Sequence, residues 1–269
     1  MLAGRPPSAR RGPSRQASRR GLLLAGAAVL AGAGCTGARD AAGGSASAAT
    51  AAGTPAPTSN ATPTSTPTTT PAPTLPPGLT EADVAAGVLQ RQVPGSGGGA
   101  LDVVPGSVPA PASARVRTLR VEVERDLVTA GVLDPAAFAD FALGVLNDPR
   151  GWGAGGATSF ERTDGEAELR LVLATPDTSA ALCRPLRTMG TLSCRVGDAA
   201  VLTWYRWVEA IPDYGEDRTG YRQYLVNHEV GHLLGHGHEP NPGAGRLAPV
   251  MMQQTKGLDG ALPNPWPNP

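Results

Sequence analysis

One short stretch of the chain contains all four of its histidines. It reads NHEVGHLLGHGHEP, from Asn227 to Pro240, with histidines at 228, 232, 236 and 238. It completes the clearest helical pattern in the sequence, TGYRQYLVNHEVGHLLG at 219–235, in which apolar residues form two stripes. A helix that is apolar on two sides is usually buried. The sequence therefore predicts a central buried helix, started by Asp217 or Thr219 and ended near Gly235.

The histidine spacing predicts a metal site. Residues four apart on a helix are separated by about 400°, so His228 and His232 lie on nearly the same face. Glu229 is rotated by about 100° from His228, which suits contact with a water on the metal better than ligation. Gly235 allows the chain to leave the helix and return His238 as a third ligand. His236 is interpreted as a loop side chain, with a role as an alternative ligand left open.

Zinc is the metal that this ligand set favours. Zinc binds imidazole well and prefers four ligands, so three histidines leave one position open for water. Structural zinc sites are usually closed by four protein ligands, and no cysteine lies near these histidines. The open position favours catalysis, with zinc lowering the pKa of its water from about 15.7 towards 7. Glu229 is then expected to act as general base and afterwards as general acid.

The full pattern, H-E-x-x-H-x-x-G-x-x-H, resembles the signature of metzincin zinc metallopeptidases. The chain is most similar to a poorly characterised family of secreted bacterial proteins in the zincin-like group. That resemblance also rests on LCRPLRTMGTLSC, GRLAPVMMQQT and PNPWP, and covers most of 115–269. It implies a zincin-like fold, zinc-dependent peptide hydrolysis, and a methionine turn beneath the metal. Met251 is the best match for that methionine, and Met252 is the second choice.

Two features depart from the resemblance. Relatives tend to carry a cysteine pair flanking the methionine turn, whereas Asn241 and Ala261 occupy those places here. No tyrosine follows Tyr224, so metzincins that use a tyrosine just after the turn are not a guide to this site. The sequence alone does not indicate which group stabilises the oxyanion.

The rest of the domain predicts an α+β fold in which a twisted mixed sheet backs the central helix. The segment DPAAFADFALGVLNDPRGW predicts a helix capped by Asp134, with Pro135 in its first turn. We expect strands at about 117–125, 158–163, 167–176 and 199–207. A substrate would pair as an added strand along a sheet edge, for which 199–204 is the candidate.

Several single residues have structural interpretations. Tyr221, Tyr224, Trp204 and Trp207 are expected in the core, the tryptophans with an alternative place along the cleft. Glycine inside a helix is unfavourable by about 1 kcal/mol relative to alanine, so Gly231 predicts close packing against a neighbouring element.

Cys183 and Cys194 are 11 positions apart and are expected to form a disulfide in an oxidising compartment. The alternative is a regulatory thiol that ligates zinc and blocks the site. Cys35 is left unpaired by this assignment.

The first 35 residues resemble an export signal. RRGPSRQASRR is basic, GLLLAGAAVLAGAG is an apolar stretch of 14 residues, and Cys35 follows. SRRGLLL is similar to a twin-arginine motif, and AGAGC is similar to a lipoprotein cleavage box, although Gly32 stands where leucine is usual. We expect Cys35 to be lipidated, with simple secretion as the alternative. The mature protein is then extracytoplasmic, and its one link to the bacterial membrane is the lipid anchor.

Composition divides the remainder into two parts. Residues 36–78 are rich in Pro, Thr, Ala and Ser and predict a disordered linker, whereas 79–269 is long enough for one domain with a core. Beyond the first 35 residues the chain has 17 basic and 23 acidic side chains, and no basic patch favours nucleic acid. A peptide or protein substrate is the expected partner. The alternative functions are a zinc-stabilised surface binding module without activity and an amidase that cleaves cell-wall peptides.

Overall fold

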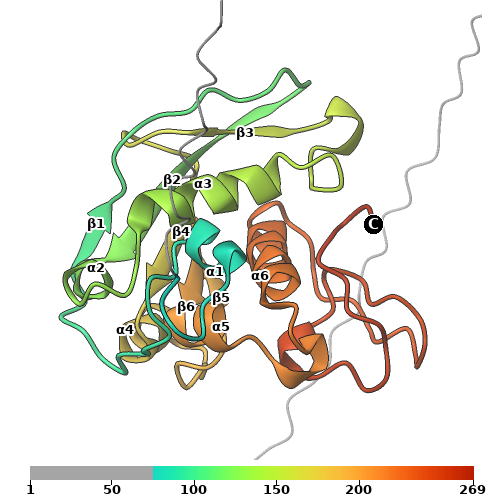
Figure 1. Cartoon of the computed structure of the whole chain (residues 1–269). Coiled ribbons are helices and arrows are strands. Elements are labelled where there is room, and N and C mark those ends of the chain that lie inside the picture. The colour runs from blue at the N-terminus through green and yellow to red at the C-terminus, as the bar shows by residue number, and fades with distance from the viewer. Residues whose placement is uncertain (1–74) are drawn as a thin grey trace, which may run out of the picture. The chain divides into compact units, whose positions relative to one another are not determined.

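A mixed, open sheet of six strands is the frame of the α+β fold (Figure 1). The computed structural model describes residues 75–269. The expected export signal at 1–35, the lipidation site Cys35 and the expected linker as far as residue 74 lie outside the described residues.

The strand order is β1-β2-β4-β6-β5, and β3 pairs with the first half of β2. β2, β3, β4 and β6 are parallel, whereas β1 and β5 are antiparallel to their neighbours. The strands are β1 (Leu101–Val103), β2 (Val116–Glu124), β3 (Ser159–Arg162), β4 (Leu169–Ala174), β5 (Cys194–Val196) and β6 (Ala199–Thr203). The first three predicted strands are therefore confirmed.

Alternation along β2 separates the two faces of the sheet. Leu119, Val121 and Val123 point into the main core and are almost fully buried. Glu122 lies on the other face, where its carboxylate accepts hydrogen bonds from the guanidinium groups of Arg120 and Arg170. Period-two alternation of this kind is what a strand requires when its faces have different environments.

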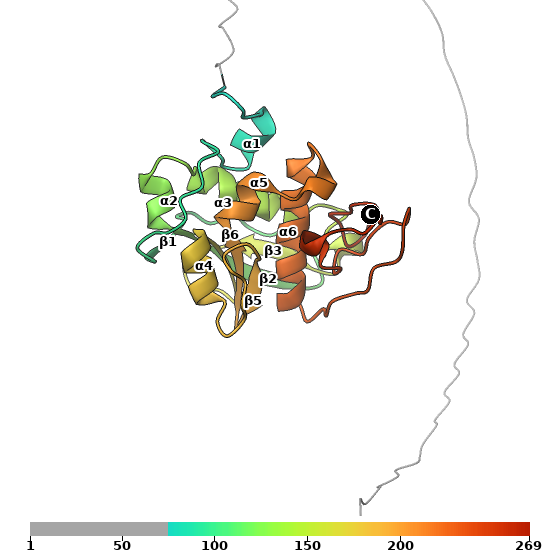
Figure 2. The ribbon, with the colours of Figure 1, turned by 90° about the horizontal axis from the view of Figure 1, so that it is seen from below.

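Helices cover both faces (Figures 1 and 2). On the core face, α3 (Pro135–Leu146) begins as predicted, because Asp134 accepts from the backbone N–H groups of Ala136 and Ala137. On the opposite face, α4 (Pro176–Leu182) packs on β4 and β6. The short α2 (Arg125–Thr129) follows β2 directly, and the 3-10 turn η1 (Ala154–Gly156) follows α3.

The predicted strand at 199–207 is wrong in its second half. β6 ends at Thr203, and α5 (Trp204–Glu209) begins at the next residue. Aromatic residues favour strands in isolation, which made the segment resemble a continuous strand. In the fold, Trp204 and Trp207 share one helical face, and their ring N–H groups donate to the carbonyls of Gln92 and Ala86. Burial of both indoles with satisfied N–H groups therefore outweighs the local preference. Both tryptophans are core residues, as predicted.

The central helix is α6 (Arg218–Leu233), which packs beside β6 and β5 (Figure 2). Asp217, one of the two predicted caps, accepts from the N–H of Gly220 at 2.7 Å. Gly235 follows with φ of +98°, the conformation expected for it. Tyr221 and Tyr224 are buried in the core, as predicted.

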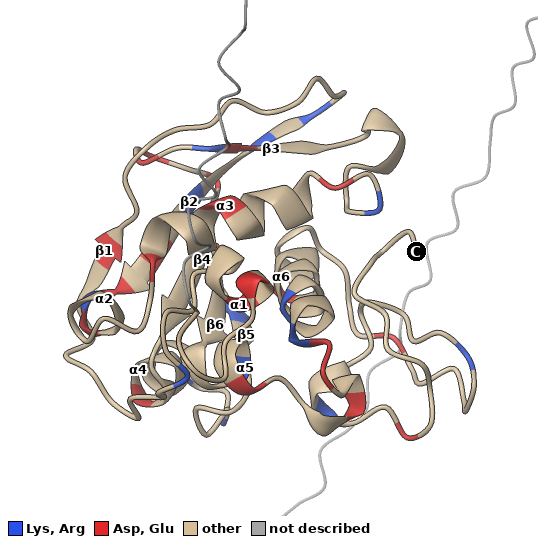
Figure 3. Ribbon diagram, in the orientation of Figure 1, with Lys and Arg blue, Asp and Glu red and all other residues tan. Residues whose placement is uncertain are grey.

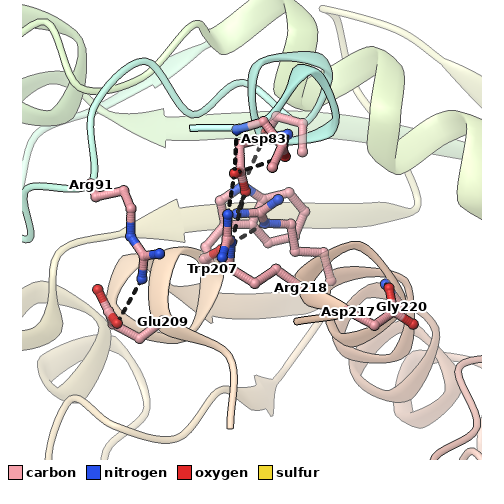
Figure 4. Close-up of polar contacts among 10 residues, drawn as sticks. Asp83, Arg91, Trp207, Glu209, Asp217, Arg218 and Gly220 are labelled. Atoms are coloured by element: carbon pink, nitrogen blue, oxygen red, sulfur yellow. Dashed lines mark hydrogen bonds and ion pairs between the residues drawn. The ribbon is translucent and has the colours of Figure 1, made fainter. Parts of the chain in front are cut away.

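A buried ion-pair network joins the start of the domain to α6 (Figure 4). Asp83 lies in α1 (Glu81–Ala85), and its carboxylate accepts from the guanidinium groups of Arg218 and Arg222. Arg222 is 1% exposed and also donates to the carbonyl of Trp207. Burial of an unpaired guanidinium is costly, so Asp83 is required to keep Arg222 inside.

The chain beyond α6 is mostly irregular and is held by side-chain hydrogen bonds. Gln254 and Asn264 are buried, the former donating to the carbonyl of Asn264 and the latter to that of Ala248. Asn241, at one of the places where relatives carry cysteine, donates to the carbonyl of Leu258 at 2.8 Å. A hydrogen bond thus links two segments where a disulfide is absent. Two 3-10 turns complete the fold, η2 (Pro212–Tyr214) and η3 (Gln254–Lys256).

Acidic and basic residues are interspersed along the described ribbon (Figure 3). Within 75–269, no helix combines the length and the apolar character needed to cross a membrane.

Candidate metal centre and cleft

Three histidines meet at one point beside α6. His228 and His232 come from the helix, and His238 comes from the chain that returns after Gly235. One ring nitrogen from each lies within 4.8 Å of the other two, and the Nε2 atoms of His232 and His238 are 3.1 Å apart. The three predicted metal ligands are therefore brought together.

Backbone carbonyls orient two of the rings. His228 Nδ1 lies 2.8 Å from the carbonyl oxygen of Val250, and His232 Nδ1 lies 2.8 Å from that of His236. A carbonyl can only accept, so each Nδ1 carries the proton and each Nε2 presents a lone pair. Metal-binding histidines are usually fixed in this way.

The donor set fits a zinc ion. Two nitrogens that lie about 2.0–2.1 Å from one tetrahedral zinc are about 3.3 Å apart, close to the spacing of His232 and His238. A direct hydrogen bond between the rings has a similar length, so the distance alone does not identify a metal. Burial lowers the pKa of His228 to about 3, and burial with the nearby charges of His232 and Lys256 lowers that of His238. Neutral imidazole is the form that binds metal.

His236 lies apart from this cluster. Its ring stacks on Trp152 with centroids 4.3 Å apart, and the indole N–H of Trp152 donates to the carbonyl of Asn227. The backbone carbonyl of His236, rather than its ring, serves the site by accepting from His232. The interpretation of His236 as a loop side chain agrees with this placement.

Met251 lies against α6 close to the ligands. It belongs to a tight turn in which the N–H of Met252 donates to the carbonyl of Pro249. A Cβ atom added to Gly231 would lie 2.5 Å from Met251 Sδ and 2.6 Å from the Trp152 ring. The close packing expected at Gly231 is therefore confirmed. The same turn supplies the Val250 carbonyl that orients His228.

Glu229 is a buried carboxyl group without a protein partner. It is 5% exposed, and it makes no hydrogen bond or ion pair with any residue in 75–269. Burial raises the pKa of Glu229 to about 8. A carboxyl group with free oxygens and a pKa near neutrality is suited to proton transfer.

Two adjoining cavities form a cleft over the histidines. The large cavity has a volume of about 400 Å³, and the small cavity about 190 Å³. Five residues line both: Leu186, Ser193, His228, Glu229 and Gln253. The cleft thus runs between α6 and the segment at 186–195, with Glu229 exposed to both cavities.

The predicted disulfide between Cys183 and Cys194 is present. It closes the loop that supplies Leu186 and Ser193 to the cleft wall. Two cysteines bonded to each other cannot ligate zinc, so the alternative of a blocking thiol is wrong. Closing a loop of this size stabilises a protein by roughly 2–3 kcal/mol in the chain-entropy model.

The sheet edge at the cleft is not the one predicted. The candidate region 199–204 is mostly β6, which lies between β4 and β5 and so has no free edge. β5 is the edge strand, and Cys194 and Arg195 from it line the large cavity. A three-residue strand is too short for its pattern to stand out in the sequence, and only its pairing with β6 identifies it.

The chain belongs to the DUF3152 family. The family model, described as a protein of unknown function, matches residues 89–263, more than half of the chain. No curated protein and no solved structure matches the chain. The DUF3152 match includes all three clustered histidines and Glu229, but it begins after α1 and so excludes Asp83.

The sequence analysis did not single out several polar residues that line the DUF3152 cleft, among them Arg187, Arg195, Gln253 and Lys256. Gln253 could have been found from the sequence, because it lies two residues after Met251, the residue predicted in the methionine turn. Its side-chain oxygen accepts from Lys256 Nζ at 3.0 Å. Its Nε2 group donates to no residue of the described chain, and therefore remains available to a ligand.

Proposed function

We propose that this protein is a zinc-dependent peptidase of metzincin type with a zincin-like fold. The observation that carries the proposal is the convergence of three imidazoles beside an unpartnered, buried glutamate in an open cleft. A structural metal site has no need of such a carboxyl group, whose burial without a partner is unfavourable.

His228, His232 and His238 would hold the ion through their ring nitrogens, with Met251 packed beneath the helix. When bound, zinc polarises the substrate carbonyl and makes an attacking water acidic enough to lose its proton near neutral pH. Glu229 accepts that proton and then donates it to the departing amine. A neighbouring dication favours the carboxylate form of Glu229, which burial alone disfavours.

Gln253 is our candidate for stabilising the oxyanion. It lines both cavities together with Glu229, and Lys256 holds its side-chain oxygen. This orientation leaves the Nε2 group free to donate to the carbonyl oxygen as negative charge develops on it. Gln253 would thus have the role that a tyrosine has in those metzincins that carry one after the methionine turn.

The substrate is a peptide that lies extended along β5. Its backbone would add a strand to this edge of the sheet, above the histidines. The resemblance of residues 1–35 to an export signal supports a secreted or lipid-anchored protein, and the disulfide is consistent with an oxidising compartment.

The test is Glu229→Gln in the mature protein. We expect one zinc per chain in both proteins by metal analysis, cleavage of an unbiased peptide library by the wild type, and no cleavage by the variant. Removal of zinc with a chelator should abolish cleavage, and added zinc should restore it.

Two results would favour the alternative functions. Stoichiometric zinc in a wild-type protein that cleaves neither peptides nor cell-wall fragments would indicate a binding module. Cleavage of cell-wall fragments alone would indicate an amidase.

A further inference from the structure

The cleft is lined by more basic than acidic side chains. Three basic side chains line its two cavities, Arg187 and Lys256 in the small cavity and Arg195 in the large one. Among residues 75–269, Glu229 is the only acidic side chain that lines either cavity. Cations around a cleft of low dielectric raise the local concentration of anionic ligands.

These three cations are also free of ion pairs. None of them forms an ion pair with an acidic group in 75–269, whereas buried arginines such as Arg162 and Arg222 are paired. Isolated exposed basic residues are ordinarily solvated surface groups. Here Arg187 and Lys256 border the same small cavity, and Arg195 borders the adjoining large one. Lys256 is held in place by its bond to Gln253, with two ammonium hydrogens left over.

The small cavity has the size and polarity to receive one acidic side chain. Its volume of about 190 Å³ is below the 300–1,000 Å³ of a typical site for a whole ligand. Hydroxyl-bearing residues line it beside the two cations: Thr188, Ser193, Tyr224 and Thr255.

We propose that the small cavity binds a carboxylate of the substrate, adjacent to the bond that is cleaved. The carboxylate is either an acidic side chain or the free C-terminus of a short peptide. Arg187 and Lys256 supply charged donors, and Leu186 and Leu192 enclose the aliphatic part. This inference rests on the proposed peptidase function and defines its substrate class.

The first experiment compares end-blocked peptide libraries that differ by Glu, Gln or Lys at single positions. We expect kcat/KM to be about tenfold higher for Glu than for Gln, equivalent to about 1.4 kcal/mol, and lowest for Lys. A parallel Gln library with an unblocked C-terminus separates the two sources of the carboxylate. Preference for either source supports the inference and identifies which one is used.

The second experiment assigns the preference to the cavity. The double variant Arg187→Gln/Lys256→Gln should bring the Glu-to-Gln ratio towards one. Arg115→Gln removes an exposed arginine that lines neither cavity, and should leave the ratio unchanged. The ratio is unaffected by a general loss of activity, so a displaced Gln253 would not imitate the expected result.

A binding measurement separates this inference from the peptidase proposal. Fluorescence anisotropy of labelled Glu and Gln peptides is measured on Glu229→Gln protein, in which the isosteric amide preserves the shape of the small cavity and Arg187 and Lys256 are retained. Tighter binding of the Glu peptide without any cleavage by the wild type would support carboxylate binding in the small cavity and reject the peptidase function. Cleavage with equal rates for Glu, Gln and free-carboxylate peptides would overturn the inference and leave the peptidase function intact. Equal binding in the absence of cleavage would overturn both.

Discussion

At the scale of single residues, the two histidines beyond α6 have separate tasks. His238 directs its ring to the other ligands, whereas the ring of His236 stacks on Trp152. The difference arises within three residues, since the N–H of His236 donates to Gly231 and the N–H of Glu239 donates to Met251. These two backbone bonds place His238 over the site and turn His236 away.

The first prediction concerns these two histidines. His238→Ala should weaken zinc binding by about tenfold or more, because even outer-shell partners of a metal site contribute 10–100-fold. His236→Ala should bind zinc almost as the wild type does, since its carbonyl is retained. Competition with a chromophoric chelator measures both. An equal loss in the two variants would contradict the assigned ligand set.

The second prediction tests Gln253 as oxyanion donor. Gln253→Leu should lower kcat by about 10²–10³-fold with little change in KM, as expected when a donor acts mainly in the transition state. Gln90→Leu is the control, because Gln90 is a glutamine outside both cavities. A rise in KM with unchanged kcat would instead assign Gln253 to substrate binding.

At the scale of elements, the contact between α6 and the turn at 249–252 determines the site. The turn reaches α6 at two points, through the carbonyl of Val250 on His228 and through Met251 on Gly231. Any residue larger than glycine at 231 would push the turn outward and carry the Val250 carbonyl with it.

The third prediction uses glycines on two helices. Gly231→Ala should destabilise the fold by about 1–3 kcal/mol, because the new methyl group would overlap Met251 and Trp152. Gly144→Ala on α3 has open space around the new Cβ and should stabilise by about 0.5–1 kcal/mol. Urea unfolding of both variants provides the comparison. Stabilisation by both substitutions would show that the turn does not pack closely on α6.

At the scale of the whole molecule, the start of the domain is tied to the site helix. α1 lies outside the DUF3152 match, yet Asp83 is the acidic partner of the buried Arg222. Burial would raise the pKa of Asp83, but hydrogen bonds from Arg218, Thr80 and Arg222 hold it well below its usual value. Asp83 is therefore present as the charged carboxylate in the folded protein.

The fourth prediction follows from this pair. Asp83→Asn should destabilise the zinc-free protein by about 3–5 kcal/mol at neutral pH, because Arg222 loses its charge partner. Asp102→Asn removes an exposed pair with Arg125 and should cost about 1 kcal/mol or less. Chemical unfolding at several pH values measures both effects.

The depressed pKa of Asp83 determines how its contribution to stability changes with pH. The folded pKa of Asp83 is depressed, so its stabilisation is complete above the unfolded pKa of about 3.9. It is lost as pH falls below that value towards the folded pKa. The stability difference between wild type and Asp83→Asn should therefore shrink in acid. A difference that is constant from pH 7 to pH 3 would show that the Asp83 charge does not stabilise the fold.

The sequence alone determined the features that depend on short spacing. Four-residue intervals put His228 and His232 on one helical face, Asp134 started α3, and Gly235 marked the exit from α6, whereas the start of α6 was narrowed only to Asp217 or Thr219. The disulfide was predictable for a related reason, since two cysteines lay 11 positions apart in a chain with an export-like N-terminus. In each case the physical cause acts within a few residues or one closed loop.

Only the tertiary structure decided the features that join distant segments. The switch from β6 to α5 depends on carbonyls more than 100 positions away, and the edge position of β5 depends on its pairing. The ion pair of Asp83 with Arg222 spans 139 positions, and Arg187 and Lys256, far apart in the sequence, line the same cavity. No local pattern records such contacts, because the free energy of burying and pairing these groups exists only once the chain has folded.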